Sequence, residues 1–192
     1  MKKIFAVALP MAAMLALSAC SNNMYAEVAR FHSNQPMNRG TLAIVSAVPE
    51  NQNSVEFQTH AETVAVEMRR HGFSTGLPAD QVQYIATLDI TQSDGTTIAR
   101  PGTTVNVPVG PLSLGVASPT RRSNSSSTIR TTTVQVQIKR AADGVAIWEG
   151  RASKDAKVGT QEATLTWAVP ALAGALFKDF PGRPGVTKNV RL

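Results

Sequence analysis

The side chains with the clearest chemical potential are two histidines that each follow a glutamate by four residues. Glu56 precedes His60, and Glu67 precedes His71, within a segment of helical periodicity. On a helix such pairs share one face, where they could bind a metal ion or exchange protons. A solvated helix face is the alternative, with His71 well placed near the negative end of the helix dipole. We expect the solvated face, because it is the commoner arrangement.

The first residues have the pattern of an export signal. Lys2 and Lys3 precede an apolar run at residues 4–17, which is too short to span a bilayer as a stable helix. The letters LSAC at residues 17–20 then place small side chains before Cys20. This order matches a bacterial lipobox, with cleavage between Ala19 and Cys20. An ordinary signal peptide with a chance cysteine is the alternative.

In a lipobox protein the cysteine thiol receives diacylglycerol and the new amine is acylated, commonly with palmitate, which gives a stable membrane anchor. Ser21 follows Cys20 in place of an aspartate. By enterobacterial sorting rules this predicts the outer membrane, with the domain facing the periplasm. We therefore expect a signal peptide at residues 1–19, a lipidated tether at 20–37 and a single domain at 38–192.

Motifs of known catalytic classes are missing from the sequence. The stretch GPLSLG at residues 110–115 has the wrong spacing for a nucleophile elbow, and no phosphate loop, dinucleotide fingerprint or H-E-x-x-H occurs. With one cysteine in the chain, a disulfide framework and a cysteine-based zinc site are excluded. We predict a protein that is not an enzyme and that needs no metal or other cofactor, although folding could still bring distant acids together.

Charge is unevenly distributed along the chain, whose net formal charge is +6. Residues 95–142 contain no aspartate or glutamate, and four arginines there form a candidate contact patch: Arg100, Arg121, Arg122 and Arg130. An anionic envelope polymer or lipid head groups would suit this patch. Nucleic acid is not expected, because no aromatic residue separates the cations. A solvated basic edge that resists aggregation is the alternative.

Hydrophobic periodicity predicts the first elements. Residues 41–48 are almost continuously apolar, which is typical of a strand buried on both faces. A helix should follow, capped by Asn53 with Glu56 in capping-box spacing, and should end near His71 before Gly72. Its apolar stripe consists of Phe57, Ala61, Val64, Ala65 and Met68.

Two further segments alternate as strands, at residues 82–90 and 128–140. A turn at Asp143-Gly144 leads into the next strand. A three-residue loop at 142–144 would pair Ile138 with Trp148 and Val134 with Ala152, which keeps apolar side chains on one face, whereas a two-residue loop would not.

The last third of the chain predicts a helix at residues 161–180, kinked or opened by Pro170, and then a short basic tail. Trp148 and Trp167 are expected to be core anchors. The fold class is therefore α/β, of the α+β sandwich type, with a mainly antiparallel sheet and two helices on one face. A long irregular insert rich in Gly, Pro and Ser, at about residues 96–127, interrupts it.

Several of these landmarks resemble bacterial lipoproteins with the domain of unknown function 4136. They are the lipobox, ENQNSVEFQTHAETVAVEMRRHGF, ADQVQYIATLDI, DGVAIWEGRA and ALFKDFPGRPGVTKNV, which together represent most of residues 38–190. The FPG-x-x-G ending is the most distinctive piece. The resemblance implies a fold and a location, and it brings no catalytic residues.

The sequence thus favours a lipid-anchored cell-envelope protein that contributes structure or contacts a partner, such as another envelope protein. A periplasmic binding module for an anionic glycan, a lipid head group or a small ligand is the alternative. A hydrolase that uses scattered acids ranks third.

Overall fold

Eight strands and two α-helices make up the part of the chain that the computed structural model describes, residues 24–33, 37–93, 97–99 and 126–192. The strands are β1 Tyr25–His32, β2 Thr41–Ser46, β3 Ser74–Thr75, β4 Tyr84–Ser93, β5 Thr97–Ala99, β6 Ser126–Arg140, β7 Ala146–Lys157 and β8 Val186–Arg191. The helices are α1 Val55–Arg70 and α2 Leu165–Phe177, with single 3₁₀ turns at Pro49–Asn51, Ala79–Gln81 and Gln161–Ala163.

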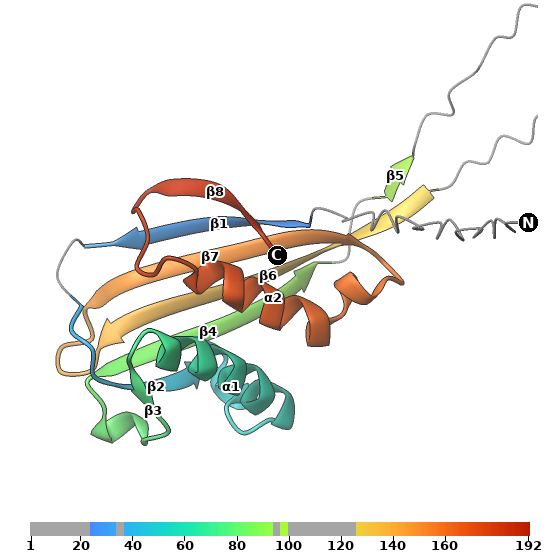
Figure 1. Ribbon diagram of the computed structural model, residues 1–192. Helices are drawn as coiled ribbons and strands as arrows, with labels where there is room; N and C mark the ends of the chain where they lie inside the picture. The colour runs from blue at the N-terminus through green and yellow to red at the C-terminus, as the bar shows by residue number, and fades with distance from the viewer. Residues whose placement is uncertain (1–23, 34–36, 94–96, 100–125) are drawn as a thin grey trace, which may run out of the picture.

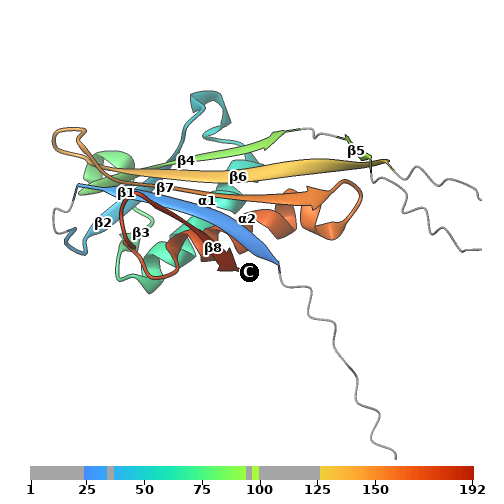
Figure 2. The same ribbon diagram turned by 90° about the horizontal axis from the view of Figure 1, so that it is seen from above.

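The strands form one sheet in the order β3-β2-β4-β6-β7-β1-β8, and β5 pairs with β6 beside this path. Strands β3, β2 and β4 run parallel to one another, and the remaining pairs are antiparallel. The sheet is therefore mixed, and the expected antiparallel arrangement holds for most of it. Both helices lie on the same side of the sheet, as Figures 1 and 2 show.

The central hairpin has the apolar register that the sequence predicts. Ile138 pairs with Trp148 and Val134 pairs with Ala152, and all four side chains are buried. The turn differs from the expected three-residue loop. The Arg140 amide donates to the Val145 carbonyl at 2.9 Å, so the turn begins at residue 141, and a register shift next to Ile138 absorbs the extra residue.

Strand β1 corrects the expected tether. Residues 25–32 lie between β7 and β8, so the sheet begins well before residue 38. Ala26, Val28 and Arg30 alternate toward the core, and all three are buried. Small side chains and an arginine give this strand little hydropathy, which is why the sequence suggests a polar linker. Strand β8 likewise replaces the expected basic tail.

The two helices depart from expectation mainly at their ends. Ser54, and not Asn53, caps α1, because its side-chain oxygen accepts a hydrogen bond from the Phe57 amide at 3.0 Å. Helix α2 begins at Leu165 and ends at Phe177, and Pro170 stays on its exposed side. Most of the remaining side chains of α2 are buried against β6, β7 and β1: Ala168, Val169, Leu172, Ala173, Ala175, Leu176 and Phe177.

Strand β2 is less enclosed than expected. Leu42 and Ala43 are buried, whereas the residues from Ile44 to Ser46 are only half-buried. The insert predicted at 96–127 lies mostly outside the described residues. Its two ends lie within them and are strands, since Thr97–Ala99 pairs with the start of β6.

Candidate functional site

The predicted lipidation and contact residues lie largely outside the described part of the chain. Ala19 and Cys20 precede it, and Arg100, Arg121 and Arg122 lie in the undescribed part of the insert. Arg130 lies on β6 and is half-buried. The anionic-polymer patch and the lipid anchor therefore stay predictions.

The two histidine pairs of α1 have different surroundings. Glu67 accepts a hydrogen bond from Arg70 at 2.6 Å, and His71 ends the helix with its ring 5.3 Å from that of Phe180. This pair is structural. Among the described residues, no group of three or more His, Cys, Asp or Glu side chains could hold a metal ion.

His60 is not on a solvated face, which corrects the sequence expectation. Only 9% of the residue is exposed, and its Nε2 has no hydrogen-bond partner among the described residues. The Glu56 Oε1 lies 3.9 Å from Nε2, beyond hydrogen-bond distance. A buried polar atom without a partner lowers the stability of the fold by about 1–3 kcal/mol, so His60 destabilises the domain in this position.

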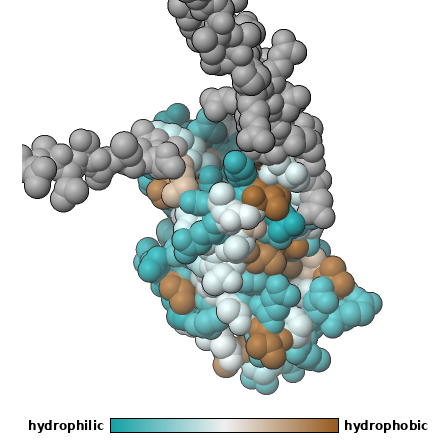
Figure 3. All heavy atoms as spheres, turned by 90° about the vertical axis from the view of Figure 1, so that its right-hand side faces the viewer, coloured by the Kyte–Doolittle hydropathy of each residue, from teal (hydrophilic) through white to brown (hydrophobic). Residues whose placement is uncertain are grey.

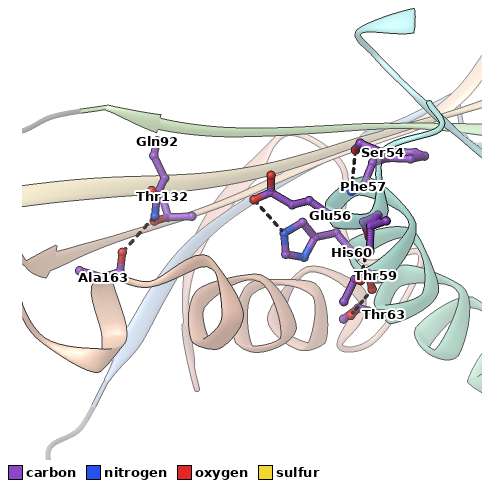
Figure 4. Close-up of polar contacts among 10 residues, drawn as sticks. Ser54, Glu56, Phe57, Thr59, His60, Thr63, Gln92, Thr132 and Ala163 are labelled. Carbon is purple, nitrogen blue, oxygen red and sulfur yellow. Dashed lines mark hydrogen bonds and ion pairs between the residues drawn. The ribbon is translucent and has the colours of Figure 1, made fainter. Parts of the chain in front are cut away.

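His60 lines a cavity of about 280 Å³ between the N-terminal parts of α1 and α2, below β4. Figure 4 shows His60 and Glu56 leaving the same side of α1 and turning toward one another. The remaining lining is mixed and comes from several elements. Its apolar residues are Val48, Phe57, Leu88, Ile90 and Leu165, and its polar residues are Ser46, Asn51, Ser54 and Asp89. We call this hollow the His60 cavity.

Exposed apolar side chains surround the end of the molecule at which α1 and α2 begin. Val48 and Val55 flank the start of α1 and are 44% and 81% exposed, and Val158 precedes α2. Figure 3 views this end and shows separate hydrophobic patches among hydrophilic residues. Of these three valines, Val48 also lines the His60 cavity.

A second and larger hollow lies along the edge of the sheet. It has a volume of about 700 Å³ and is lined by β2 from Leu42 to Val45, by one side of α1 and by residues 75–79. The side chains of α1 that line it include Gln58, Ala61 and Arg69. Arg69 is held in place there, because it pairs with Glu62 and donates to the Thr75 hydroxyl at 2.7 Å. We call this hollow the β2 groove.

Part of the backbone of β2 faces the β2 groove without a ladder partner. The Ala47 amide donates to Leu88 of β4, whereas the Ser46 amide donates to the Gln52 side chain at 2.7 Å. Because successive residues of a strand point to opposite sides, Ile44 shares the outward direction of Ser46. Strand β3 pairs only with Thr41 and Leu42. Within the described residues, the amide and carbonyl of Ile44 thus lie on an open strand edge.

The FPG-x-x-G ending has a structural role. It follows α2 and folds against β1 and β7: the Trp148 Nε1 donates to the Pro181 carbonyl at 3.0 Å, and His32 Nε2 lies 3.1 Å from the Gly182 carbonyl. Phe180 packs against Trp148 and Phe177. The most distinctive motif of the chain therefore encloses the core and leaves both hollows free.

Arg30 completes this arrangement and is the residue that sequence reasoning missed. It is 6% exposed, and its guanidinium donates to the carbonyls of Leu176 at 2.8 Å and of Ala175 and Lys178 at 2.9 Å. Burial lowers the pKa of Arg30, and the Asp179 carboxylate offsets part of that shift. Arginine nevertheless stays charged in proteins, so Arg30 caps the carbonyl end of α2 with a positive charge.

Comparison with known families gives a clear result. The model of a domain of unknown function, DUF4136, matches residues 30–182. The chain belongs to this family. An uncharacterized protein from Zymomonas mobilis is 25% identical over 97% of this chain and 84% of its own length. The match runs from Arg30, near the end of β1, to Gly182, inside the FPG-x-x-G ending.

Several solved structures have a similar arrangement of elements at low identity. A PelC dodecamer from Paraburkholderia phytofirmans covers 82% of this chain and 99% of its own, with 8% identity and a TM-score of 0.44. A PDZ domain protein from Parabacteroides distasonis covers 87% of this chain and 39% of its own, with 9% identity and a TM-score of 0.49. A minor lipoprotein from Acinetobacter baumannii covers 75% of this chain and 89% of its own, with 12% identity and a TM-score of 0.39. At these scores the likenesses give no argument about function.

Within the described residues, no helix has the length and apolar character needed to cross a membrane.

Proposed function

We propose that this chain is a lipid-anchored protein of the cell envelope that binds an extended polypeptide segment of an envelope partner at the β2 groove. The anchor is the acylated Cys20 in the outer membrane, and the domain faces the periplasm. The role is one of contact, with no chemical step. The observation that supports it most directly is the open edge of β2 beside Ile44.

An extended segment is the occupant that fits this edge. The amide and carbonyl of Ile44 offer one donor and one acceptor in the plane of the sheet, which an added strand can satisfy. Ala61 and Leu77 line the groove beside them, among polar side chains such as Gln58, so an apolar side chain of the added strand that contacts them would be removed from water. A second copy of β2 is a poorer occupant, because α1 and residues 75–79 stand on either side of the edge.

The edge is also limited in length, as expected for a specific contact. On one side of Ile44, the Ser46 amide already donates to the Gln52 side chain. On the other side, β3 pairs with Thr41 and Leu42. An exposed and continuous edge would invite aggregation, and native proteins blunt such edges. Here the unpaired stretch is short and recessed, which favours one bound strand over indefinite pairing.

Selection of short random peptides on the purified protein in detergent tests this proposal. Peptides that bind should slow hydrogen exchange at the Ile44 amide, because that group becomes the donor of a new hydrogen bond. Ile44→Pro removes this donor, and proline is tolerated where a strand amide points away from the sheet. We expect it to weaken binding by about tenfold or more.

Ile44→Val is the matched control, since it keeps the backbone groups and removes one methylene. Gln58→Trp gives a second variant, which fills the groove from an exposed position of α1. Peptides that bind Ile44→Pro and Gln58→Trp as tightly as the unchanged protein would overturn the proposed site. Melting curves of each variant separate loss of binding from loss of fold.

The anchor is tested separately by Cys20→Ser. We expect this variant to appear in the soluble periplasmic fraction or to accumulate as an unprocessed precursor. A variant that is cleaved normally and still requires detergent for extraction would show that Cys20 does not anchor the chain.

A further inference from the structure

The His60 cavity has the features of a binding site that the contact role leaves unused. It combines a buried imidazole nitrogen, a neighbouring carboxylate and several apolar side chains, which come mainly from α1, β4 and the start of α2. We propose that it binds a small organic amine, with the ammonium group between His60 and Glu56 and the apolar body against Val48, Ile90 and Leu165.

The first argument is the state of His60. Its Nε2 is buried and has no hydrogen-bond partner among the described residues, although the residue lines the cavity. Native proteins satisfy nearly all buried polar atoms, and an exception calls for an explanation. The nitrogen is closed to solvent in this conformation, so a ligand donor would satisfy it once the His60 ring turns toward the cavity.

The second argument is the charge at the site. Glu56 has a carboxylate that only accepts hydrogen bonds, and its Oε1 lies 3.9 Å from His60 Nε2. A single ammonium group can donate to both atoms, because it has several N–H donors. Of the described residues that line the cavity, none is lysine or arginine. A ligand carboxylate would meet the Glu56 carboxylate with no lysine or arginine beside it.

The third argument is the size and the remaining lining of the cavity. A volume of about 280 Å³ is near the lower end of the range for ligand pockets, so the occupant is small. Asp89 also borders the cavity, but Leu88 before it points to the helices, so the Asp89 side chain points to the opposite face of the sheet. Apolar contacts for a ligand body are therefore available at Val48, Ile90 and Leu165, beside the polar side chains of Ser46, Asn51 and Ser54.

Titration with benzylamine, followed by methyl NMR of the full protein in detergent, tests the proposal. We expect saturable shifts of the methyl signals of Val48, Ile90 and Leu165. Benzyl alcohol has the same body without the charge and should bind more weakly, and benzoate should not bind. Equal binding of the alcohol would overturn the assignment to an ammonium group, and preferential binding of benzoate would overturn the sign of the charge.

Two variants locate the contacts. Glu56→Gln should weaken benzylamine binding by only about threefold to tenfold, because the Glu56 side chain is 70% exposed and its charge is screened by water. Glu50→Gln removes an exposed carboxylate that does not line the cavity, and binding should stay unchanged. His60→Leu replaces the imidazole with an apolar side chain of similar reach and should abolish the shifts while the protein still melts cooperatively. Unchanged binding by Glu56→Gln or by folded His60→Leu would overturn the proposal.

The test is independent of the β2 groove, because Ile44 and Gln58 do not line the His60 cavity. Loss of peptide binding in the groove variants with retained amine binding would separate the two sites.

Discussion

Arg30 Nε donates a hydrogen bond of 2.8 Å to the carbonyl oxygen of Leu176, from the first strand of the sheet to the last turn of α2. The same guanidinium reaches two more carbonyls of that helix end. A helix leaves its final carbonyls without internal partners, and they are usually met by a glycine turn or by water. Here a buried arginine from a distant strand meets them, and this contact fixes α2 to β1.

Replacing Arg30 by Met should therefore destabilise the domain by about 2–4 kcal/mol, because three carbonyls near the core lose a charged donor. Chemical denaturation measures the free energy of unfolding. Arg183→Met alters an exposed arginine of the same region and should change stability by less than about 0.5 kcal/mol. Equal stability of the two variants would contradict the capping role of Arg30.

The glycines of the FPG-x-x-G ending give a second prediction. Gly182 and Gly185 both have positive φ, of 82° and 72°. A Cβ at Gly182 would lie 2.7 Å from Arg30 Cδ, whereas a Cβ at Gly185 meets nothing within 4 Å. We expect Gly185→Ala to cost about 1 kcal/mol from the backbone alone and Gly182→Ala about 2–3 kcal/mol.

The excess cost at Gly182 should depend on Arg30. In the double variant Arg30→Met with Gly182→Ala, the shorter and more flexible methionine leaves space for the alanine methyl group. The double variant should therefore lose less free energy of unfolding than the two single variants lose in total. Strict additivity in thermal or chemical unfolding would show that the two residues do not constrain one another.

The tryptophans give a third prediction. Trp148 is 1% exposed and stacks on Phe177 with 5.6 Å between ring centroids, so Trp148→Ala should cost about 3–5 kcal/mol. Trp167 is half-buried, with Lys154 Nζ 5.9 Å from its ring, and Trp167→Ala should cost about 1 kcal/mol. Iodide should quench the fluorescence of Trp167 and leave that of Trp148 largely unaffected. Strong quenching of Trp148 would contradict its burial.

Local patterns predicted the central part of the fold. Alternation along β6 and β7 was enough to predict the pairing of Ile138 with Trp148, because a slip by one residue would have moved every apolar side chain to the opposite face. Helix α1 followed from its apolar stripe, and the error of one residue at its cap arose because Asn53 and Ser54 are both good capping residues.

The errors concern residues whose environment is set by distant partners. Arg30 looks polar in sequence, and its burial depends on the α2 carbonyls, which lie about 145 residues away. His60 has the spacing of a surface histidine, and its burial depends on β4 and on the start of α2. The edge at Ile44 is open because β3 ends after two residues, and the sequence of β2 contains no sign of where β3 ends. The cavities could not be predicted for the same reason.

Strand β1 also determines how the domain would bear tension. The Leu192 amide donates to the Met24 carbonyl, and β1 is bordered by β7 on one side and β8 on the other. A pull from an anchor at Cys20 would act along the length of β1, and the hydrogen bonds of both ladders would resist it together, as in shear. An anchor joined to an edge strand would load only one ladder. The domain would thus hang from the membrane by a strand that resists being peeled away.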